Sequence, residues 1–197
     1  MSLVDRAKKV LLEPKQEWPV IDAEATSVAA LYTGYIMPLA AIGPIAAIIG
    51  WSVFGMRLPL VGSYRVPIGT AIQHGVVQYV LGLAGVFVLA LIIDALAPTF
   101  GGQKNRLQAL KVAAYSCTAA WVVGIVALVP ALGILGLLGL YSLYLLYLGL
   151  PVLMKAPNEK AMGYTVVVII SAVVLFFLIG MITVRFVSGP TPAMPGL

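Results

Sequence analysis

Hydrophobic residues form long uninterrupted runs along this chain, and these runs define its predicted elements. A helix needs about 17–25 predominantly apolar residues to cross roughly 30 Å of hydrocarbon. Five runs reach that length, and they cover residues 28–54, 75–96, 112–129, 133–154 and 164–184. The pattern therefore predicts an all-α fold, a polytopic membrane bundle of five transmembrane helices within residues 27–187.

Proline and glycine divide these runs into helices. Residues 112–154 contain no Asp, Glu, Lys, Arg or His, and this stretch is too long for one span but fits two spans joined by a turn. Pro130–Gly133 supplies the turn, because both residue types interrupt helices. Pro38 and Pro44 lie within the first run, and the backbone donors that they lack predict a kinked first helix.

A more polar segment precedes the first span. Ser2 followed three residues later by Asp5 predicts a helix N-terminus, and apolar residues then recur on one helical face. Pro14 ends this helix, and an extended link follows, in which Trp18 is expected to act as an interface anchor at headgroup level. Residues 1–26 are thus predicted to form a cytoplasmic segment whose short amphipathic helix lies in the membrane interface.

Composition and charge add an orientation to this architecture. Of the 197 residues, 61% are hydrophobic and 10% are charged, whereas a soluble domain carries about 25% charged residues. Nine of the twelve Lys and Arg residues lie in segments on the same side as the N-terminus. Because short cytoplasmic loops are enriched in Lys and Arg, the N-terminus is expected in the cytoplasm of a bacterial cell and the C-terminus in the periplasm. Residues 188–197 are predicted to form a flexible periplasmic tail.

The inventory of reactive side chains argues against an enzyme. His74 and Cys117 are the single histidine and the single cysteine, so an ordinary zinc site is excluded. Asp94 is the sole acidic residue between Glu24 and Glu159, so neither a paired acid and base nor an activated nucleophile is assembled. No catalytic residue, cofactor, metal ion or nucleic acid is expected. Whether Asp94 and His74 have functional or structural roles stays open.

Several polar residues near the ends of the spans form a candidate functional or structural cluster. Asp94 ends the second span and Lys111 opens the third on the same side, so the two are expected to pair. Three tyrosines in the fourth span form a stripe that either packs between helices or lines a polar pathway. The complete candidate cluster is Asp94, Asn105, Lys111, Tyr115, Tyr141, Tyr144 and Tyr147.

The fourth span also carries glycines at intervals of three. Small residues let helix backbones approach closely in lipid, where the hydrophobic effect does not drive helices together. The fourth span is therefore predicted to be the packing centre of the bundle. The predicted helix-packing residues are Gly133, Gly136, Gly139, Gly149 and Pro151.

Three segments resemble the bacterial branch of the Yip (Ypt/Rab-interacting protein) membrane family. They are Glu13-Pro14-Lys15-x-Glu17-Trp18-Pro19-Val20-Ile21, Gly34-Tyr35-Ile36-x-Pro38-Leu39-Ala40 and Tyr141-Ser142-Leu143-Tyr144-Leu145-Leu146-Tyr147-Leu148-Gly149-Leu150-Pro151. The resemblance implies five membrane helices and a cytoplasmic N-terminus. Eukaryotic relatives contact Rab-type GTPases through a long cytoplasmic N-terminal region. About 26 residues precede the first span here, which argues against a GTPase partner.

Two functional hypotheses follow from these observations. The first is an inner-membrane protein with a non-enzymatic scaffold or membrane-organising role, whose partners are membrane lipids and either a second copy or other membrane proteins. The alternative is a small-solute or ion transporter, or a lipid-translocating protein, that uses Asp94, Lys111 and the tyrosine stripe. The five spans show no inverted repeat of the kind common in secondary transporters, which favours the first hypothesis.

Overall fold

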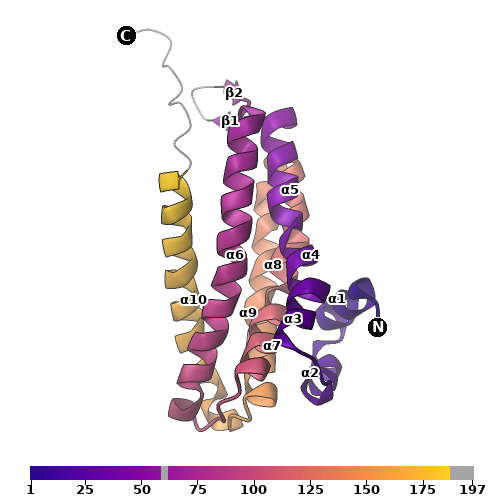
Figure 1. Cartoon of the computed structure of the whole chain (residues 1–197), viewed down its shortest axis with the longest axis vertical. Coiled ribbons are helices and arrows are strands. Elements are labelled where there is room, and N and C mark those ends of the chain that lie inside the picture. The colour runs from indigo at the N-terminus through magenta and orange to yellow at the C-terminus, as the bar shows by residue number, and fades with distance from the viewer. Residues whose placement is uncertain (59–61, 187–197) are drawn as a thin grey trace.

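A computed structural model describes residues 1–58 and 62–186 of the chain. These residues form an elongated helical bundle with two short helices beside one end (Figure 1). Five helical stretches are long and apolar enough to cross a membrane: Val28–Phe54, Ile68–Phe100, Arg106–Leu128, Pro130–Leu153 and Asn158–Thr183. The predicted all-α bundle of five membrane helices is therefore confirmed. The predicted tail at 188–197 lies outside the described residues.

The first span is a helix whose hydrogen-bond pattern changes along its length. Its segments are α3 (Val28–Leu31), a π-helical turn (Tyr32–Ile36), α4 (Met37–Ala40), α5 (Ile42–Ile49) and a second π-helical turn (Gly50–Phe54). The Ser27 side chain caps the start by accepting a hydrogen bond from the amide of Ala30. Pro38 and Pro44 lack the donor that a regular α-helix requires, and the span is irregular around them.

A β-hairpin follows the first span. Strands β1 (Met56–Leu58) and β2 (Gly62–Tyr64) pair antiparallel, with Met56 opposite Tyr64. Gly55 directly precedes the hairpin and has a φ of 75°, a backbone conformation that glycine adopts without a steric cost. The apolar pattern did not predict these strands, because three residues are too few for an alternation to be recognised.

The remaining four spans run up and down with short connections. The second span is α6 (Ile68–Leu96) with a 3₁₀ turn (Ala97–Phe100). The third is α7 (Arg106–Ser116), α8 (Thr118–Val123) and a 3₁₀ turn (Gly124–Leu128). The fourth is a 3₁₀ helix (Pro130–Leu140) followed by α9 (Tyr141–Leu153), and the fifth is α10 (Asn158–Phe186). Val129 has an extended backbone, so the turn precedes the predicted Pro130–Gly133 and Pro130 begins the next helix. Proline suits that first helical position, since its missing amide would have no partner there.

The N-terminal segment contains two helices rather than one. Helix α1 (Leu3–Leu12) begins at Ser2, whose hydroxyl accepts from the amide of Asp5, as predicted. The Ser2 hydroxyl also donates to the Asp5 carboxylate and so lowers the pKa of that group. Helix α2 (Pro14–Ala23) replaces the predicted extended link, which was wrong because Pro14 starts a helix as readily as it ends one.

Burial is uneven among the five spans of the described chain. The third span is the most enclosed, whereas the fourth and fifth are the least. The core lies mainly around α7, which packs between α6 and α9, and α1 and α2 add buried side chains beside it (Figure 1). The prediction that the fourth span is the packing centre is therefore wrong, and the third span occupies that place.

Candidate functional site

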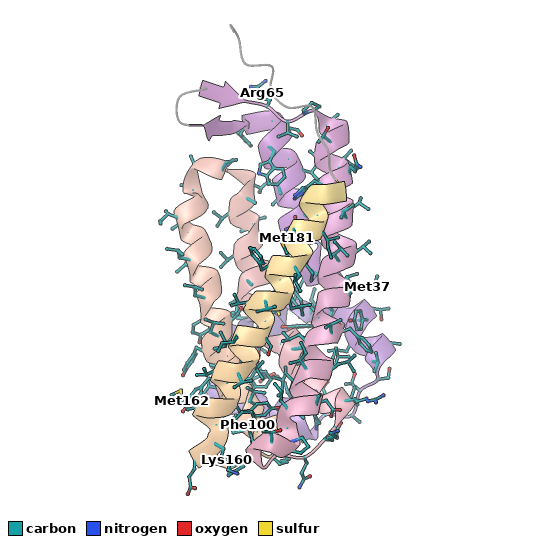
Figure 2. All side chains as sticks on the ribbon, turned by 90° about the vertical axis from the view of Figure 1, so that its left-hand side faces the viewer. Met37, Arg65, Phe100, Lys160, Met162 and Met181 are labelled. Carbon is teal, nitrogen blue, oxygen red and sulfur yellow. The ribbon has the colours of Figure 1, made fainter. Side chains whose placement is uncertain are left out.

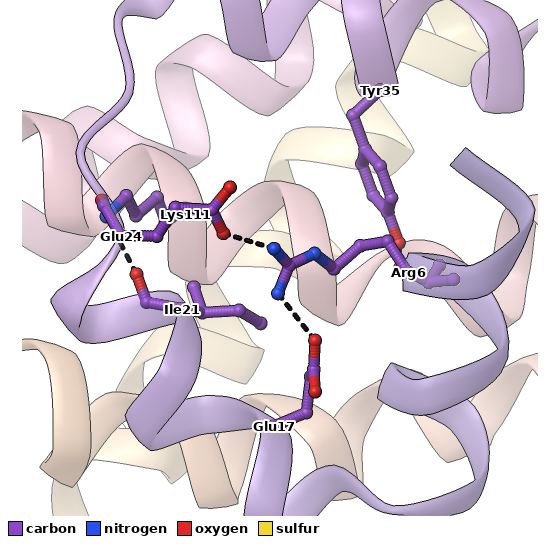
Figure 3. Close-up of polar contacts among 7 residues, drawn as sticks. Arg6, Glu17, Ile21, Glu24, Tyr35 and Lys111 are labelled. Atoms are coloured by element: carbon purple, nitrogen blue, oxygen red, sulfur yellow. Dashed lines mark hydrogen bonds and ion pairs between the residues drawn. The ribbon is translucent and has the colours of Figure 1, made fainter. Parts of the chain in front are cut away.

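Three charged side chains from the N-terminal segment form an ion-pair group, of which Arg6 and Glu17 are buried and Glu24 is exposed. Arg6 of α1 pairs through Nη1 with Oε1 of Glu17 at 2.5 Å and through Nη2 with Oε2 of Glu24 (Figure 3). Arg6 and Glu17 are only 6% and 4% exposed. Buried charges are costly unless they are paired and hydrogen-bonded, and the guanidinium meets this condition with both carboxylates. The pairing holds α1 against α2.

Helix α7 contributes donors to the end of α2. Lys111 Nζ donates to the carbonyl oxygens of Ile21 at 2.8 Å and Glu24 at 2.7 Å. Gln108, one turn earlier, donates to the carbonyl of Asp22 at 3.1 Å. The last carbonyls of a helix have no intrahelical donor, and α2 has no basic residue in its own last turn. Helix α7 therefore caps α2. We call Arg6, Glu17, Glu24 and Lys111 the docking cluster.

Two further contacts connect the N-terminal helices to the bundle. Lys155, which follows α9, pairs with Asp22 at 2.5 Å. The Tyr141 hydroxyl at the start of α9 donates to the carbonyl of Leu11 at 3.1 Å. Both α1 and α2 are thus held to the spans by polar contacts as well as by packing.

Aromatic rings form the apolar side of the docking cluster. Tyr115 lies with its ring centroid 4.6 Å from that of Tyr35 and 6.4 Å from that of Trp18, and the Arg6 guanidinium is 5.9 Å from the Tyr115 centroid. Trp18 is 1% exposed and packs against Gly149, where a Cβ would lie 2.7 Å from the indole ring. The predicted role of Trp18 as an interface anchor is wrong, because α2 turns this side chain into the core.

The predicted polar cluster separates into several places. Lys111 and Tyr115 meet at the docking cluster, and Asn105 caps α7 by accepting from the amides of Leu107 and Gln108. In the fourth span, Tyr144 and Tyr147 are 40% and 37% exposed. These residues therefore do not line a common polar pathway in the described chain.

Asp94 does not pair with Lys111, and that prediction is wrong. The ion pairs of the described chain do not include Asp94, and its Oδ1 is buried without a hydrogen-bond partner there. The adjacent Ile93 carbonyl accepts from the Tyr164 hydroxyl at 2.5 Å. The pairing fails because the Lys111 ammonium group is already occupied by the carbonyl groups of α2.

The predicted glycine contacts are partly wrong. No described atom lies within 4 Å of a Cβ built at Gly133 or Gly136, whereas a Cβ at Gly139 would meet Ala120 at 3.5 Å. Gly149 packs closely, but against Trp18. Pro151 lies inside α9.

The acidic members of the docking cluster were not anticipated. Helical periodicity places Arg6 on the polar face of the N-terminal helix, and Glu17 falls in the segment that was predicted to be an extended link. A signal was present: the segment before the first span contains five acidic residues beside four basic ones, which permits internal pairing. Choosing the partners requires the angle between α1 and α2, which the sequence pattern does not contain.

The chemistry of the docking cluster suits attachment. Its two cations and two carboxylates balance in formal charge, and each cation is hydrogen-bonded to an acceptor. Among the described residues, no group of three or more His, Cys, Asp or Glu side chains could hold a metal ion. The cluster therefore holds helices in register.

Comparison with known proteins assigns the family. No curated protein and no solved structure matches the chain. The model of the Yip1 domain family matches residues 8–181, a range that includes the first four spans, all but the last two residues of the fifth, and Glu17, Glu24 and Lys111. The chain therefore belongs to the Yip1 domain family of membrane proteins.

Proposed function

We propose that this protein is a non-enzymatic scaffold that organises lipids and partner proteins in its membrane. The observation that carries the proposal is the docking cluster, which joins Arg6, Glu17 and Glu24 to Lys111 of the third span. One buried ion pair, Arg6–Glu17, and one partly exposed pair, Arg6–Glu24, fix two helices outside the spans and support a rigid platform. A platform of this kind suits the positioning of other molecules.

Exposed lysines give this platform a surface for anionic lipids. Lys8, Lys9 and Lys15 are exposed on α1 and α2, and Lys104 and Lys160 are exposed at the same end of the bundle (Figure 2 labels Lys160). Each lysine near an anionic bilayer surface contributes about 1 kcal/mol to binding. The same excess of positive charge supports a cytoplasmic N-terminus and a periplasmic C-terminus in a bacterial inner membrane. Partner proteins, or a second copy, would meet the bundle through its exposed fourth and fifth spans.

The transporter alternative lacks a comparable observation. It requires Asp94, Lys111 and the tyrosine stripe along one route, but the Lys111 ammonium group is bound to the carbonyls of Ile21 and Glu24. Coupling a buried acid to transport needs a partner or a water-filled cavity, and Asp94 has no ion-pair partner among the described residues.

Reconstitution in liposomes that contain phosphatidylglycerol tests the proposal. We expect phosphatidylglycerol to be enriched among co-purifying lipids, and the triple change Lys8→Gln, Lys9→Gln and Lys15→Gln to remove most of that enrichment. Arg65→Gln, at the other end of the bundle, is the matched control and should leave it unchanged. Lipid scrambling or ion flux above that of protein-free liposomes, lost in Asp94→Ala, would overturn the scaffold in favour of translocation.

A further inference from the structure

A groove of about 620 Å³ lies among the spans at the end of the bundle opposite α1 and α2. Its walls come from α5, α6, α8 and α10 and from the 3₁₀ turn that follows α8. This volume falls within the range of about 300–1,000 Å³ that is usual for small-molecule sites. The site is separate from the docking cluster.

Small residues make part of the walls of this groove, beside large apolar side chains such as Trp121 and Phe176. Gly43 and Gly124 face each other across the first and third spans, and Gly82 and Gly180 lie on the second and fifth. No described atom lies within 4 Å of a Cβ built at Gly82 or Gly180, so both positions border empty space. Ala120 and Gly180, on α8 and α10, are exposed. The groove is therefore open to the bilayer, and Met181 in Figure 2 marks the height of this opening on α10.

Polar side chains gather at one end of the groove. His74, Gln78 and Gly82 follow one another at intervals of four on α6, so they share a helical face. Thr183 follows Gly180 on α10, which runs antiparallel to α6 (Figure 1). The His74 ring meets the Trp51 ring edge to face at a centroid distance of 4.9 Å. One end of the groove is thus polar, and the rest is apolar.

Two polar groups at this end lack partners among the described residues, whereas the Thr183 hydroxyl donates to the Ile179 carbonyl. No hydrogen bond of the Gln78 amide occurs within the described chain, although Gln78 lies in a span and is exposed. The His74 Nδ1 atom is buried and has no partner there either. An amide exposed to hydrocarbon without a hydrogen bond costs several kcal/mol, so this end of the groove favours a ligand with its own donors and acceptors. None of the described lining residues is Asp, Glu, Lys or Arg, which favours a neutral group over a charged one.

We propose that this groove binds a neutral amphiphile with a single apolar chain. The chain lies along the small-residue walls at Gly82 and Gly180, and a hydroxyl-bearing or amide-bearing head hydrogen-bonds to Gln78 at the polar end. The ligand enters sideways from the bilayer, between α8 and α10. This inference goes beyond the scaffold proposal and does not depend on the exposed lysines.

Photolabelling with a diazirine-tagged monoacylglycerol in liposomes tests this site. We expect saturable labelling of peptides from α6 and α10, displaced by unlabelled monoacylglycerol and far less by lysophosphatidylglycerol, which has one chain and a charged head. Gly82→Leu and Gly180→Leu fill the groove, and each should lower labelling about tenfold or more, as a steric misfit in an apolar pocket does. Gln78→Leu should lower labelling without lowering thermal stability, since it removes an amide that has no hydrogen-bond partner in the described chain.

The matched control is Gly136→Leu, which makes the same change at a position that borders open space outside the groove. It should label as the unaltered protein does, and no variant should have a lower unfolding midpoint than that protein. Labelling that rises linearly with probe concentration, or that persists in both filled variants, would show annular lipid only and overturn the proposal. A cross-link between two copies through the groove would identify a second chain as the occupant and overturn it too. Lipid enrichment through Lys8, Lys9 and Lys15 would be unaffected by either result.

Discussion

The ammonium group of Lys111 lies 2.8 Å and 2.7 Å from the carbonyl oxygens of Ile21 and Glu24. A charged donor at the C-terminal end of a helix satisfies free carbonyls and also opposes the negative end of the helix dipole. Here the donor comes from a different helix, 87 residues away from Glu24 in sequence. A single side chain thus connects the N-terminal pair to the third span.

Replacing Lys111 measures the strength of this connection. Lys111→Met keeps most of the side-chain volume but leaves the carbonyl groups of α2 without a donor. Because hydrogen bonds to charged groups contribute about 1.5–3 kcal/mol each and Lys111 makes two, we expect a loss of about 3 kcal/mol or more in unfolding free energy in detergent. Lys104→Met, at an exposed lysine, is the control and should stay within about 0.5 kcal/mol of the unaltered protein. Equal effects of the two changes would refute the capping role.

Asp94 is expected to behave in the opposite way. Its Oδ1 is buried without a partner in the described chain, so a neutral side chain of the same shape removes a desolvation cost without breaking a pair. Asp94→Asn should leave the unfolding midpoint unchanged or raise it. Combined with Lys111→Met, its effect should be additive, as for residues that do not interact. A double-mutant cycle with a coupling energy above about 0.5 kcal/mol would reveal contact between the two groups.

At the scale of helices, the first and third spans approach each other most closely at glycines. A Cβ built on Gly124 would lie 2.9 Å from Cα of Gly43, and one built on Gly50 would lie 2.0 Å from the Ala127 carbonyl oxygen. Backbones come this close only where neither residue has a side chain in the way. Helix association in lipid depends on such packing rather than on apolar burial. The glycines that pack are therefore not those with the regular spacing in the fourth span.

A pair of glycine substitutions distinguishes these two sets. Gly50→Ala forces a methyl group against a backbone carbonyl that cannot rotate away, and we expect destabilisation of at least about 1–3 kcal/mol. Gly136→Ala borders open space and should be neutral or slightly stabilising, because alanine costs less backbone entropy in a helix. Thermal unfolding of both variants in the same detergent checks the contrast. A larger loss for Gly136→Ala would restore the fourth span as the packing centre.

For the whole molecule, the two ends of the bundle differ in charge and structure. Arg65 and the β-hairpin lie at one end, and Phe100 and Lys160 lie at the other, beyond α1 and α2 (Figure 2). Five spans put the start of the first and the end of the last at opposite ends. The positive-inside rule predicts that the basic end faces the cytoplasm.

Cysteine accessibility tests that orientation. In a Cys117→Ser background, Arg65→Cys should react with an impermeant thiol reagent in intact bacterial cells. Gln103→Cys and Asn158→Cys, which are exposed at the other end, should react only after the membrane is opened. Labelling of Gln103→Cys in intact cells would reverse the orientation. Equal labelling of all three sites without permeabilisation would contradict the arrangement of spans.

The candidate site shows where prediction from sequence reaches its limit. Lys111 and Tyr115 were identified as candidates, whereas their contacts with α2 and Arg6 were not. Trp18 was expected at the interface, since tryptophan is common there, but Gly149 provides room for the indole inside the bundle. The partner of a side chain depends on how each helix is rotated about its own axis. In a span that is apolar on all sides, hydrophobic periodicity does not reveal that rotation.

The sequence by itself determined the number of spans, their helical character and the cap at Ser2. These features depend on local constraints: the bilayer sets a minimum apolar length, backbone groups in lipid must bond within a helix, and a cap needs only its next few residues. Only the tertiary structure decided that Lys111 donates to the carbonyl groups at the end of α2 instead of pairing with Asp94, and that Gly43 and Gly124 are in contact. Those outcomes depend on close packing between segments distant in sequence, where a rotation of one helix exchanges every partner along its face.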